Sequence, residues 1–260
     1  MYDFPEVRAA TDALWRAVAA ALESAGLADV PKRLSREDED AVWRSGDLLL
    51  SQTCGYPLTH RLAGVVETVA TPSYSAEGCH GAEYCSLVVV SEDHPAADLE
   101  SLRGSVCAYN RRDSHSGYNA LRAALAPLAG GAAFFARAVE SGAHAHSIAM
   151  VADGRADVCA VDCVSHALLA RHRPRALDGT RVLCATERAP GLPYVTRAGA
   201  GGPELERLRA ALRSVFSDPG LAHARDALLV TGIHVLDDMA YGRIDDMERS
   251  ARAAGYAEIH

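Results

Sequence analysis

The chain is predicted to be an α/β protein, because helical and strand-like patterns alternate along most of its length. Its 260 residues suffice for one large domain or for two lobes of about 100 to 150 residues each. No repeats or low-complexity tracts interrupt the alternation. These observations favour a largely parallel sheet with helices on its faces.

The first third of the chain is expected to supply one helix and three strands. Val7 to Ser24 carries apolar residues at helical spacing and ends before Gly26, a helix stop signal. Short apolar or β-rich runs predict strands at Asp47 to Gln52, Ala63 to Ala70 and Glu83 to Val90. The first of these strands ends in the loop Thr53 to Pro57, and such loops bind ligands in open α/β sheets.

The middle of the chain continues the alternation. A short helical turn at Asp98 to Gly104 leads into a strand that ends at Tyr109. Two helices are expected next, Gly117 to Leu128 and Ala132 to Ala138, separated by the turn at Gly130 and Gly131. A strand with a loop at Val139 to His144, a helix at Ser147 to Gly154 and a strand at Val158 to Val161 follow.

The remaining elements complete the pattern. Arg181 to Thr186 is strand-like, and two C-terminal helices are expected at Glu204 to Phe216 and Leu221 to Leu229. Cys159 and Cys163 would share one face of an extended chain, but no second pair at zinc-ligand spacing accompanies them, so no metal site is predicted.

The segment Arg111 to Leu121 joins a strand end to a helix start and contains two hydroxyls, Ser114 and Ser116. The first turn of a helix offers N–H groups without internal partners at the positive end of the peptide dipoles, which suits a small oxyanion. The alternative is that Asp113 or Ser114 only caps the helix.

Composition excludes several functions. The formal net charge of −8 and the scattered arginines argue against a nucleic-acid surface, and no apolar stretch is long enough for a membrane span. The N-terminus lacks a signal-peptide pattern, and the odd set of seven cysteines is typical of reduced thiols. We therefore expect a cytoplasmic protein, or a periplasmic one if the true start lies upstream.

The chain resembles the phosphate- and phosphonate-binding branch of the type 2 periplasmic binding proteins, the solute receptors of ABC importers. Six segments, in this order and spacing, carry the resemblance: Ser51 to Pro57, Gly81 to Val89, Asp98 to Tyr109, Ser114 to Gly117, Gly142 to His144 and Gly154 to Asp162. It covers most of the chain and is densest from Leu49 to Val161.

The resemblance implies two α/β lobes joined by two crossing hinge strands, with the ligand in the cleft between the lobes. The crossings are expected near Tyr84 to Val90 and Cys184 to Pro190. Lobe 1 would then comprise residues 1–87 and 184–260, and lobe 2 would be residues 88–183, inserted in lobe 1. Cys79 and Cys85 could form a bridge if a related protein were exported, which sequence alone leaves open.

The same resemblance implies a set of ligand-binding residues. Ser114, Ser116 and the N–H groups of the helix that they open, Gly117 included, would hold phosphoryl-like oxygens. The other expected contacts are Tyr56, Tyr84, His115, His144 and Asp162. Asp162 would face a ligand amine or a protonated ligand oxygen. His115 lies between the serines and is expected to point elsewhere, and both tyrosines could be ordinary core aromatics.

The leading functional prediction is a solute-binding protein, not an enzyme, that closes over a small oxyanion such as phosphate or phosphonate. Its expected partners are the small anion and, if one exists, an ABC transporter permease, with no cofactor. The alternative is a cytosolic enzyme on the same fold, similar to the menaquinone-pathway enzyme chorismate dehydratase. That reading needs a general base, for which Asp162 and His144 are the candidates.

Overall fold

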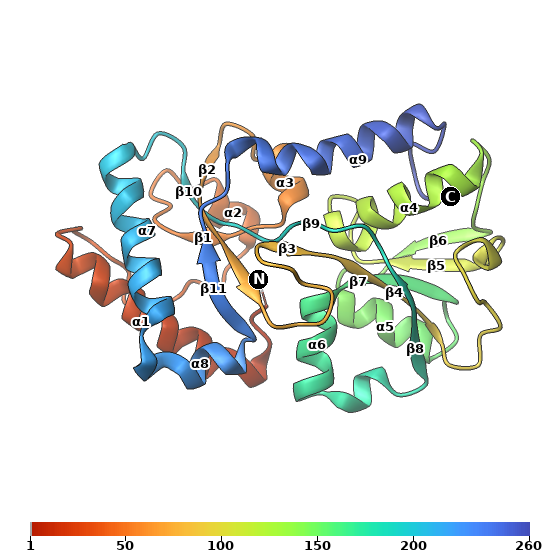
Figure 1. The fold of residues 1–260 in the computed structure, drawn as a ribbon, viewed down its shortest axis with the longest axis horizontal. Helices are drawn as coiled ribbons and strands as arrows, with labels where there is room; N and C mark the ends of the chain where they lie inside the picture. Colours follow the sequence, from red (N-terminus) through yellow and green to blue (C-terminus); the bar gives the residue numbers. More distant parts are fainter. Residues whose placement is uncertain (1) are drawn as a thin grey trace. The chain divides into compact units, whose positions relative to one another are not determined.

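The computed structural model describes residues 2–260, apart from the side chain of Asp238. The chain forms two compact units (Figure 1). Unit 1 contains the residues up to Ser75, His80–Ala82 and Gly191–Ala240. Unit 2 contains Ala76–Cys79, Glu83–Pro190 and Tyr241–His260. Each unit has its own sheet and its own apolar core, so each is described by itself.

Unit 1 is built on a four-stranded sheet in the order β1-β10-β2-β11. Every neighbouring pair in this sheet is antiparallel. The strands are β1 (Ser51–Gln52), β2 (Val66–Tyr74), β10 (Tyr194–Arg197) and β11 (Val230–His234). The helices are α1 (Arg8–Ser24), α2 (Glu39–Trp43), α3 (Gly55–Thr59), α7 (Gly202–Ser217) and α8 (Ala222–Ala227), with short 3₁₀ turns at Pro5–Val7 and Pro219–Leu221.

The helix α1 forms for the reason that the sequence suggests. Leu14, Trp15, Val18 and Leu22 recur at helical spacing and are all buried in the main core of unit 1. The helix ends at Ser24, and Gly26 then adopts a φ of 80°, a conformation that glycine reaches without steric cost. A smaller apolar cluster around Trp43, Leu62 and Val195 forms a second core of unit 1.

Unit 2 is built on a five-stranded mixed sheet in the order β6-β5-β7-β4-β8. Its strands are β4 (Ser86–Ser91), β5 (Val106–Tyr109), β6 (Arg137–Glu140), β7 (Val158–Asp162) and β8 (Thr180–Ala185). β5 is parallel to both β6 and β7, whereas β4 is antiparallel to β7 and β8. The carboxyl ends of β6, β5 and β7 therefore meet at one edge of the sheet.

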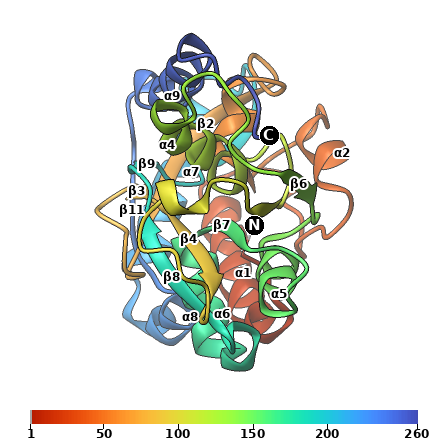
Figure 2. The same ribbon diagram turned by 90° about the vertical axis from the view of Figure 1, so that its right-hand side faces the viewer.

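Helices cover both faces of this sheet, as Figures 1 and 2 show. On one face lie α4 (Ala120–Ala129) and α9 (Gly242–Ala253), and on the other lie α5 (His144–Ala152) and α6 (Cys163–His172). One turn of π-helix, η3 (His115–Asn119), leads directly into α4. The core under α4 and α9 includes Val88, Leu121, Val158 and Tyr256. Short 3₁₀ turns of unit 2 lie at Glu100–Leu102 and Pro174–Leu177, and another, Asp238–Tyr241, begins in unit 1 and ends at the first residue of the last segment of unit 2.

A two-stranded ribbon forms where the chain enters and leaves the long continuous part of unit 2. β3 (Glu83–Tyr84) pairs antiparallel with β9 (Ala189–Pro190). Residues 83 and 190 are the first and last residues of the long continuous part of unit 2. The crossings expected at Tyr84 to Val90 and Cys184 to Pro190 each overlap one strand of this ribbon, and each also extends into the unit 2 sheet, through β4 and β8.

Several sequence-based expectations differ from the structure, and the loop expected at Thr53 to Pro57 contains the start of the helix α3. Neither sheet is largely parallel, since only β6, β5 and β7 run in one direction. The helix expected at Ala132 to Ala138 is absent, because the backbone of Phe134 and Phe135 donates to the carbonyl of His260 and the chain continues into β6. Residues 241–260, expected in lobe 1, belong to unit 2, where α9 packs on α4.

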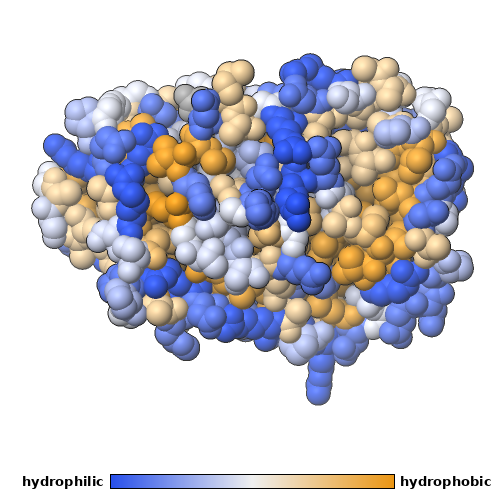
Figure 3. All heavy atoms as spheres, viewed as in Figure 1, coloured by the Kyte–Doolittle hydropathy of each residue, from blue (hydrophilic) through white to orange (hydrophobic). Residues whose placement is uncertain are grey.

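The face that Figure 3 draws mixes hydrophilic side chains with several patches of hydrophobic ones. No helix within residues 2–260 has both the length and the apolar composition needed to span a bilayer. The structure describes no cluster of three or more histidine, cysteine or acidic side chains in this range that could hold a metal ion.

Candidate functional site

Four predicted site residues of unit 2 lie at the carboxyl ends of its three parallel strands. Ser114 and Ser116 follow β5, His144 follows β6 as the first residue of α5, and Asp162 is the last residue of β7. The loops after β5 and β6 are tied together, because the N–H of Gly142 donates to the carbonyl of Asn110 at 2.9 Å. The sheet edge thus brings together side chains that are far apart in the sequence.

Ser116, His144 and Asp162 form a buried polar cluster. Ser116 Oγ lies 3.0 Å from His144 Nε2, and the same nitrogen lies 3.7 Å from Asp162 Oδ2. The side chains of His144 and Asp162 are 15% and 4% exposed. A hydroxyl, an imidazole and a carboxylate therefore converge on one small region.

Ser114 caps the helix start, as the alternative interpretation proposed, and its contact with a ligand stays a prediction. Its Oγ accepts a hydrogen bond from the N–H of Gly117 at 3.1 Å, and its carbonyl accepts one from the N–H of Asn119. The side chain therefore caps η3 and fixes the start of the π-helix and α4. Ser116 is the hydroxyl that faces His144.

Gly117 is required by close packing. A Cβ at this position would lie 1.9 Å from Asn110 Oδ1 and 3.1 Å from His144 Cε1. The residue has no unusual φ, so contact rather than conformation demands glycine. Asn110 Oδ1 is buried and has no hydrogen-bond partner within residues 2–260, which makes it a further polar group of the site.

Asp162 is held rigidly by the start of α6. Its Oδ1 accepts from the N–H of Ser165 at 2.8 Å, and its Oδ2 accepts from Ser165 Oγ at 2.6 Å. These hydrogen bonds stabilise the carboxylate as an acceptor and set its orientation. Asp162 could have been recognised from the sequence as an N-cap, because aspartate is favoured there, but no sequence signal marks Ser165. Asn110 follows β5 directly, so the strand-end rule would have found it as well.

His144 is a weak base in this position. Burial lowers the pKa of His144, and the Asp162 carboxylate and the Ala160 carbonyl offset only part of that effect. The imidazole is therefore neutral at neutral pH. A bound anion would favour its protonated form, in which the ring donates a charge-assisted hydrogen bond.

The other predicted residues are placed as follows. His115 is buried, lies 3.2 Å from Asn119 through its Nδ1, and has its ring centroid 6.0 Å from that of Tyr84. Burial lowers the pKa of His115 to about 3, and nearby Arg122 contributes to the shift. Tyr84 is buried on β3, and Tyr56 of unit 1 stacks on His60 with ring centroids 3.9 Å apart. The structure thus brings Tyr84 and His115 together inside unit 2, and their ligand contacts stay predictions, as does that of Tyr56.

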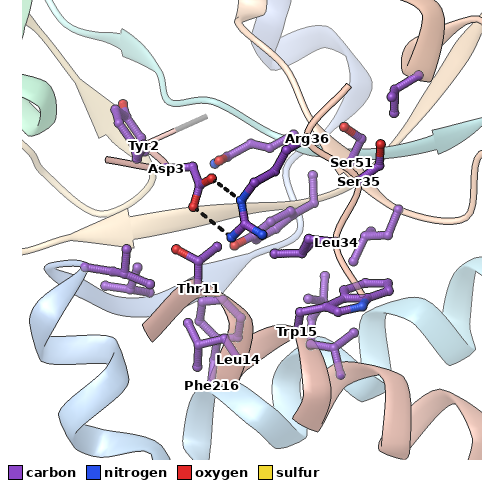
Figure 4. A pocket seen from close by; sticks show the side chains of 18 of the residues that line it. Tyr2, Asp3, Thr11, Leu14, Trp15, Leu34, Ser35, Arg36, Ser51 and Phe216 are labelled. Carbon is purple, nitrogen blue, oxygen red and sulfur yellow. Dashed lines mark hydrogen bonds and ion pairs between the residues drawn. The ribbon is translucent and has the colours of Figure 1, made fainter. Parts of the chain in front are cut away.

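A cavity of about 210 Å³ lies in unit 1 (Figure 4). Apolar side chains such as Leu14, Trp15 and Phe216 line it. Arg36, the arginine among its lining residues, forms ion pairs with Asp3 and Asp12, with N–O distances of 2.6 Å and 2.8 Å. The cavity therefore has the wrong chemistry for a small anion.

Comparisons with known proteins agree with this architecture. The binding-protein component of a phosphonate ABC transporter from Pseudomonas aeruginosa is 16% identical over 94% of this chain and 82% of its own, with a TM-score of 0.74. PhnD1 from Prochlorococcus marinus in complex with methylphosphonate is 16% identical over 94% of both chains, with a TM-score of 0.72. XAC2383 from Xanthomonas citri, bound to ATP, is 20% identical over 93% of this chain and 92% of its own, with a TM-score of 0.70.

These structural similarities are below 25% identity and show the fold, which is the two-lobed α/β fold of periplasmic binding proteins. A search of curated proteins finds no match. The model of one protein family, however, matches residues 44–241, about three quarters of the chain. The chain therefore belongs to the family of ABC transporter phosphonate periplasmic substrate-binding proteins.

Proposed function

We propose that this protein binds a small tetrahedral oxyanion that can carry a proton, such as a phosphonate or phosphate, without converting it. The observation that carries the proposal is the cluster of Ser116, His144 and Asp162 at the carboxyl ends of three strands. Ser116 and protonated His144 can donate to anionic oxygens. Asp162 can accept a hydrogen bond from a protonated ligand oxygen.

The family supports the receptor function, and a permease of an ABC transporter is the partner that the family implies. The structure with methylphosphonate in PhnD1 is a reason to test that compound first. Closure of the chain over the ligand remains part of the proposal. Small-angle scattering with and without methylphosphonate tests it, and an unchanged radius of gyration at saturation would contradict closure.

The cluster does not have the arrangement of a serine–histidine–aspartate triad, so an enzyme on this fold would have to use Asp162 or His144 as a general base without an activated serine. In a serine–histidine–aspartate triad the carboxylate binds the ring nitrogen that does not face the hydroxyl. Here Ser116 and Asp162 both approach Nε2 of His144. The carboxylate therefore cannot orient the ring for proton abstraction from the serine in the usual way.

Isothermal titration calorimetry with methylphosphonate, phosphate and sulfate tests the proposal. Sulfate has the same shape but carries no proton at neutral pH, so Asp162 should reject it by charge repulsion. We expect binding of methylphosphonate or phosphate and no binding of sulfate. Equal affinity for sulfate would contradict the role of Asp162, and mass-spectrometric turnover of the bound compound would contradict the receptor function.

Variants assign the contacts. Ser116→Ala should weaken binding by about 1.5 to 3 kcal/mol, because it removes a hydrogen bond to a charged group. Ser250→Ala, at an exposed position of α9, is the matched control and should bind normally. Asp162→Asn should reduce the difference in affinity between methylphosphonate and sulfate, because the amide can donate a hydrogen bond to an unprotonated ligand oxygen.

A further inference from the structure

Three cysteine thiols of unit 2 are in contact outside the polar cluster. The Sγ atoms of Cys79 and Cys163 are 3.5 Å apart, although 84 residues separate them in the sequence. The thiol of Cys85 also interacts with that of Cys163. All seven cysteines of the chain are free thiols, so the sulfurs in contact here are reduced.

The backbone holds Cys79 against the thiols of Cys85 and Cys163. Neighbouring Gly78 has a φ of +96°, and a Cβ there would lie 2.6 Å from Cys85 Sγ and 3.2 Å from Cys163 Cβ. Arg188 Nε donates to the carbonyl of Gly78 at 3.0 Å. The segment Ala76–Cys79 belongs to unit 2 through such contacts, whereas His80–Ala82 belongs to unit 1. The proximity of Cys79 and Cys163 is thus built into the local packing.

Cys163 is fixed from its own side as well. It is the first residue of α6, directly after Asp162, and its N–H donates to the carbonyl of Cys85 at 3.0 Å. It is 1% exposed, whereas Cys79 is partly exposed. An external reagent therefore reaches Cys79 first.

We propose that Cys79 and Cys163 form a disulfide when the protein meets a low-molecular-weight disulfide such as oxidised glutathione. The Cys79 thiolate attacks the glutathione disulfide, whose S–S bond breaks and releases one glutathione thiolate. The Cys163 thiolate then attacks the sulfur of Cys79 and releases the second. The two cysteines are oxidised, one glutathione disulfide is reduced to two thiols, and the two cysteine protons pass to the released thiolates.

The geometry favours a bridge between these two cysteines, and the pKa of Cys163 affects how fast the bridge forms. An S–S bond requires the two sulfurs to approach by about 1.5 Å, which is within reach of a side-chain rotation. The hydrogen bond with Cys79 and burial raise the pKa of Cys163 to about 12. The second step should therefore be slow at neutral pH and faster at alkaline pH. The 3.5 Å sulfur–sulfur contact joins Cys79 to Cys163, so we expect buried Cys85 to remain outside the bridge.

The test is disulfide mapping of the folded, full-length protein. The protein is incubated with oxidised glutathione at pH 8.5, alkylated with iodoacetamide under denaturing conditions and digested, and the peptides are identified by mass spectrometry. We expect one cross-linked pair that joins Cys79 to Cys163. The melting temperature should rise by roughly 5 to 15 °C relative to the reduced protein, because the bridge closes a long loop.

Variants serve as controls. Cys184→Ser removes a partly exposed thiol of β8, and this variant should still form the bridge. Cys79→Ser should lose both the cross-linked peptide and the rise in melting temperature, and circular dichroism confirms that it folds. A bridge that contains Cys85, or seven alkylated cysteines after oxidation of the wild-type protein, would overturn the proposal.

Discussion

Gly117 shows how closely the residues of the site are packed. A methyl group at this position would overlap Asn110 Oδ1 and press on His144 Cε1. We expect Gly117→Ala to lower the affinity for methylphosphonate at least about tenfold and to cost about 1 to 3 kcal/mol of stability. Calorimetric titration and urea denaturation measure the two effects. Gly242→Ala, where a Cβ meets nothing within 4 Å, is the matched control, and equal effects in both variants would refute this view.

The charge state of His144 should make binding depend on pH. Burial lowers the pKa of the imidazole, and a bound anion raises it again, so binding takes up a proton. Affinity for methylphosphonate should therefore rise as pH falls from 8 to 6, by at most about tenfold per pH unit. His144→Gln should lack this part of the slope. Titration of the ligand itself affects both proteins equally, so it cancels when the pH dependence of affinity in the variant is subtracted from that of the wild-type protein. Parallel pH slopes in the two proteins would exclude His144 as the group that takes up the proton.

At the scale of elements, the contact between α4 and α9 depends on a buried ion pair. Arg122 and Glu248 lie 3.5 Å apart with side chains 3% and 9% exposed, and Arg122 also donates to the carbonyl of Ala257. Glu248→Ala leaves the arginine buried without its charge partner and should cost about 3 to 5 kcal/mol. Glu258→Ala removes the partner of exposed Arg112 and should cost less than about 1 kcal/mol. Equal losses in chemical denaturation would contradict this difference.

The elements also show what the sequence could and could not predict. α1, α7 and β8 were predicted nearly to the residue, because their apolar spacing and stop signals agree. α6 and α9 were missed; α9 carries many charges, and its buried face is defined by its contact with α4. β1 is shorter than predicted, because a strand exists only where a partner pairs with it.

In the candidate site, too, local sequence signals could be predicted and long-range contacts could not. Ser116, His144 and Asp162 were predicted from strand ends and from the family resemblance, and the parallel register of β5, β6 and β7 brings them together. Periodicity could not show that Ser114 caps η3 or that His115 turns into the interior. Both depend on a π-helical turn that packs against Tyr84 and α9, and those residues are distant in the sequence.

For the molecule as a whole, buried histidines should limit stability in acid. Burial lowers the pKa of His115 to about 3 and lowers the pKa values of His144 and His166. Below about pH 6.5 the unfolded chain binds protons that the folded chain excludes, so the free energy of unfolding should fall by up to about 1.4 kcal/mol per pH unit for each such histidine.

Urea denaturation between pH 7 and pH 4 measures this slope. His115→Asn should reduce it, since the amide does not titrate and can still bond to Asn119. His223→Asn, at an exposed position of α8, should leave the slope unchanged. A slope in His115→Asn equal to that of the wild-type protein would show that His115 is not the source.

The path of the chain also sets the order in which the protein is completed during synthesis. Every residue of unit 1 leaves the ribosome before Tyr241, whereas unit 2 still awaits residues 241–260. Ile244 then supplies the carbonyl that Asn119 binds, and Ile259 supplies the N–H that Tyr118 OH accepts. The turn that carries Ser116 therefore acquires its final support only after unit 1 has been made, and a nascent chain would have to complete the unit that carries the polar cluster last.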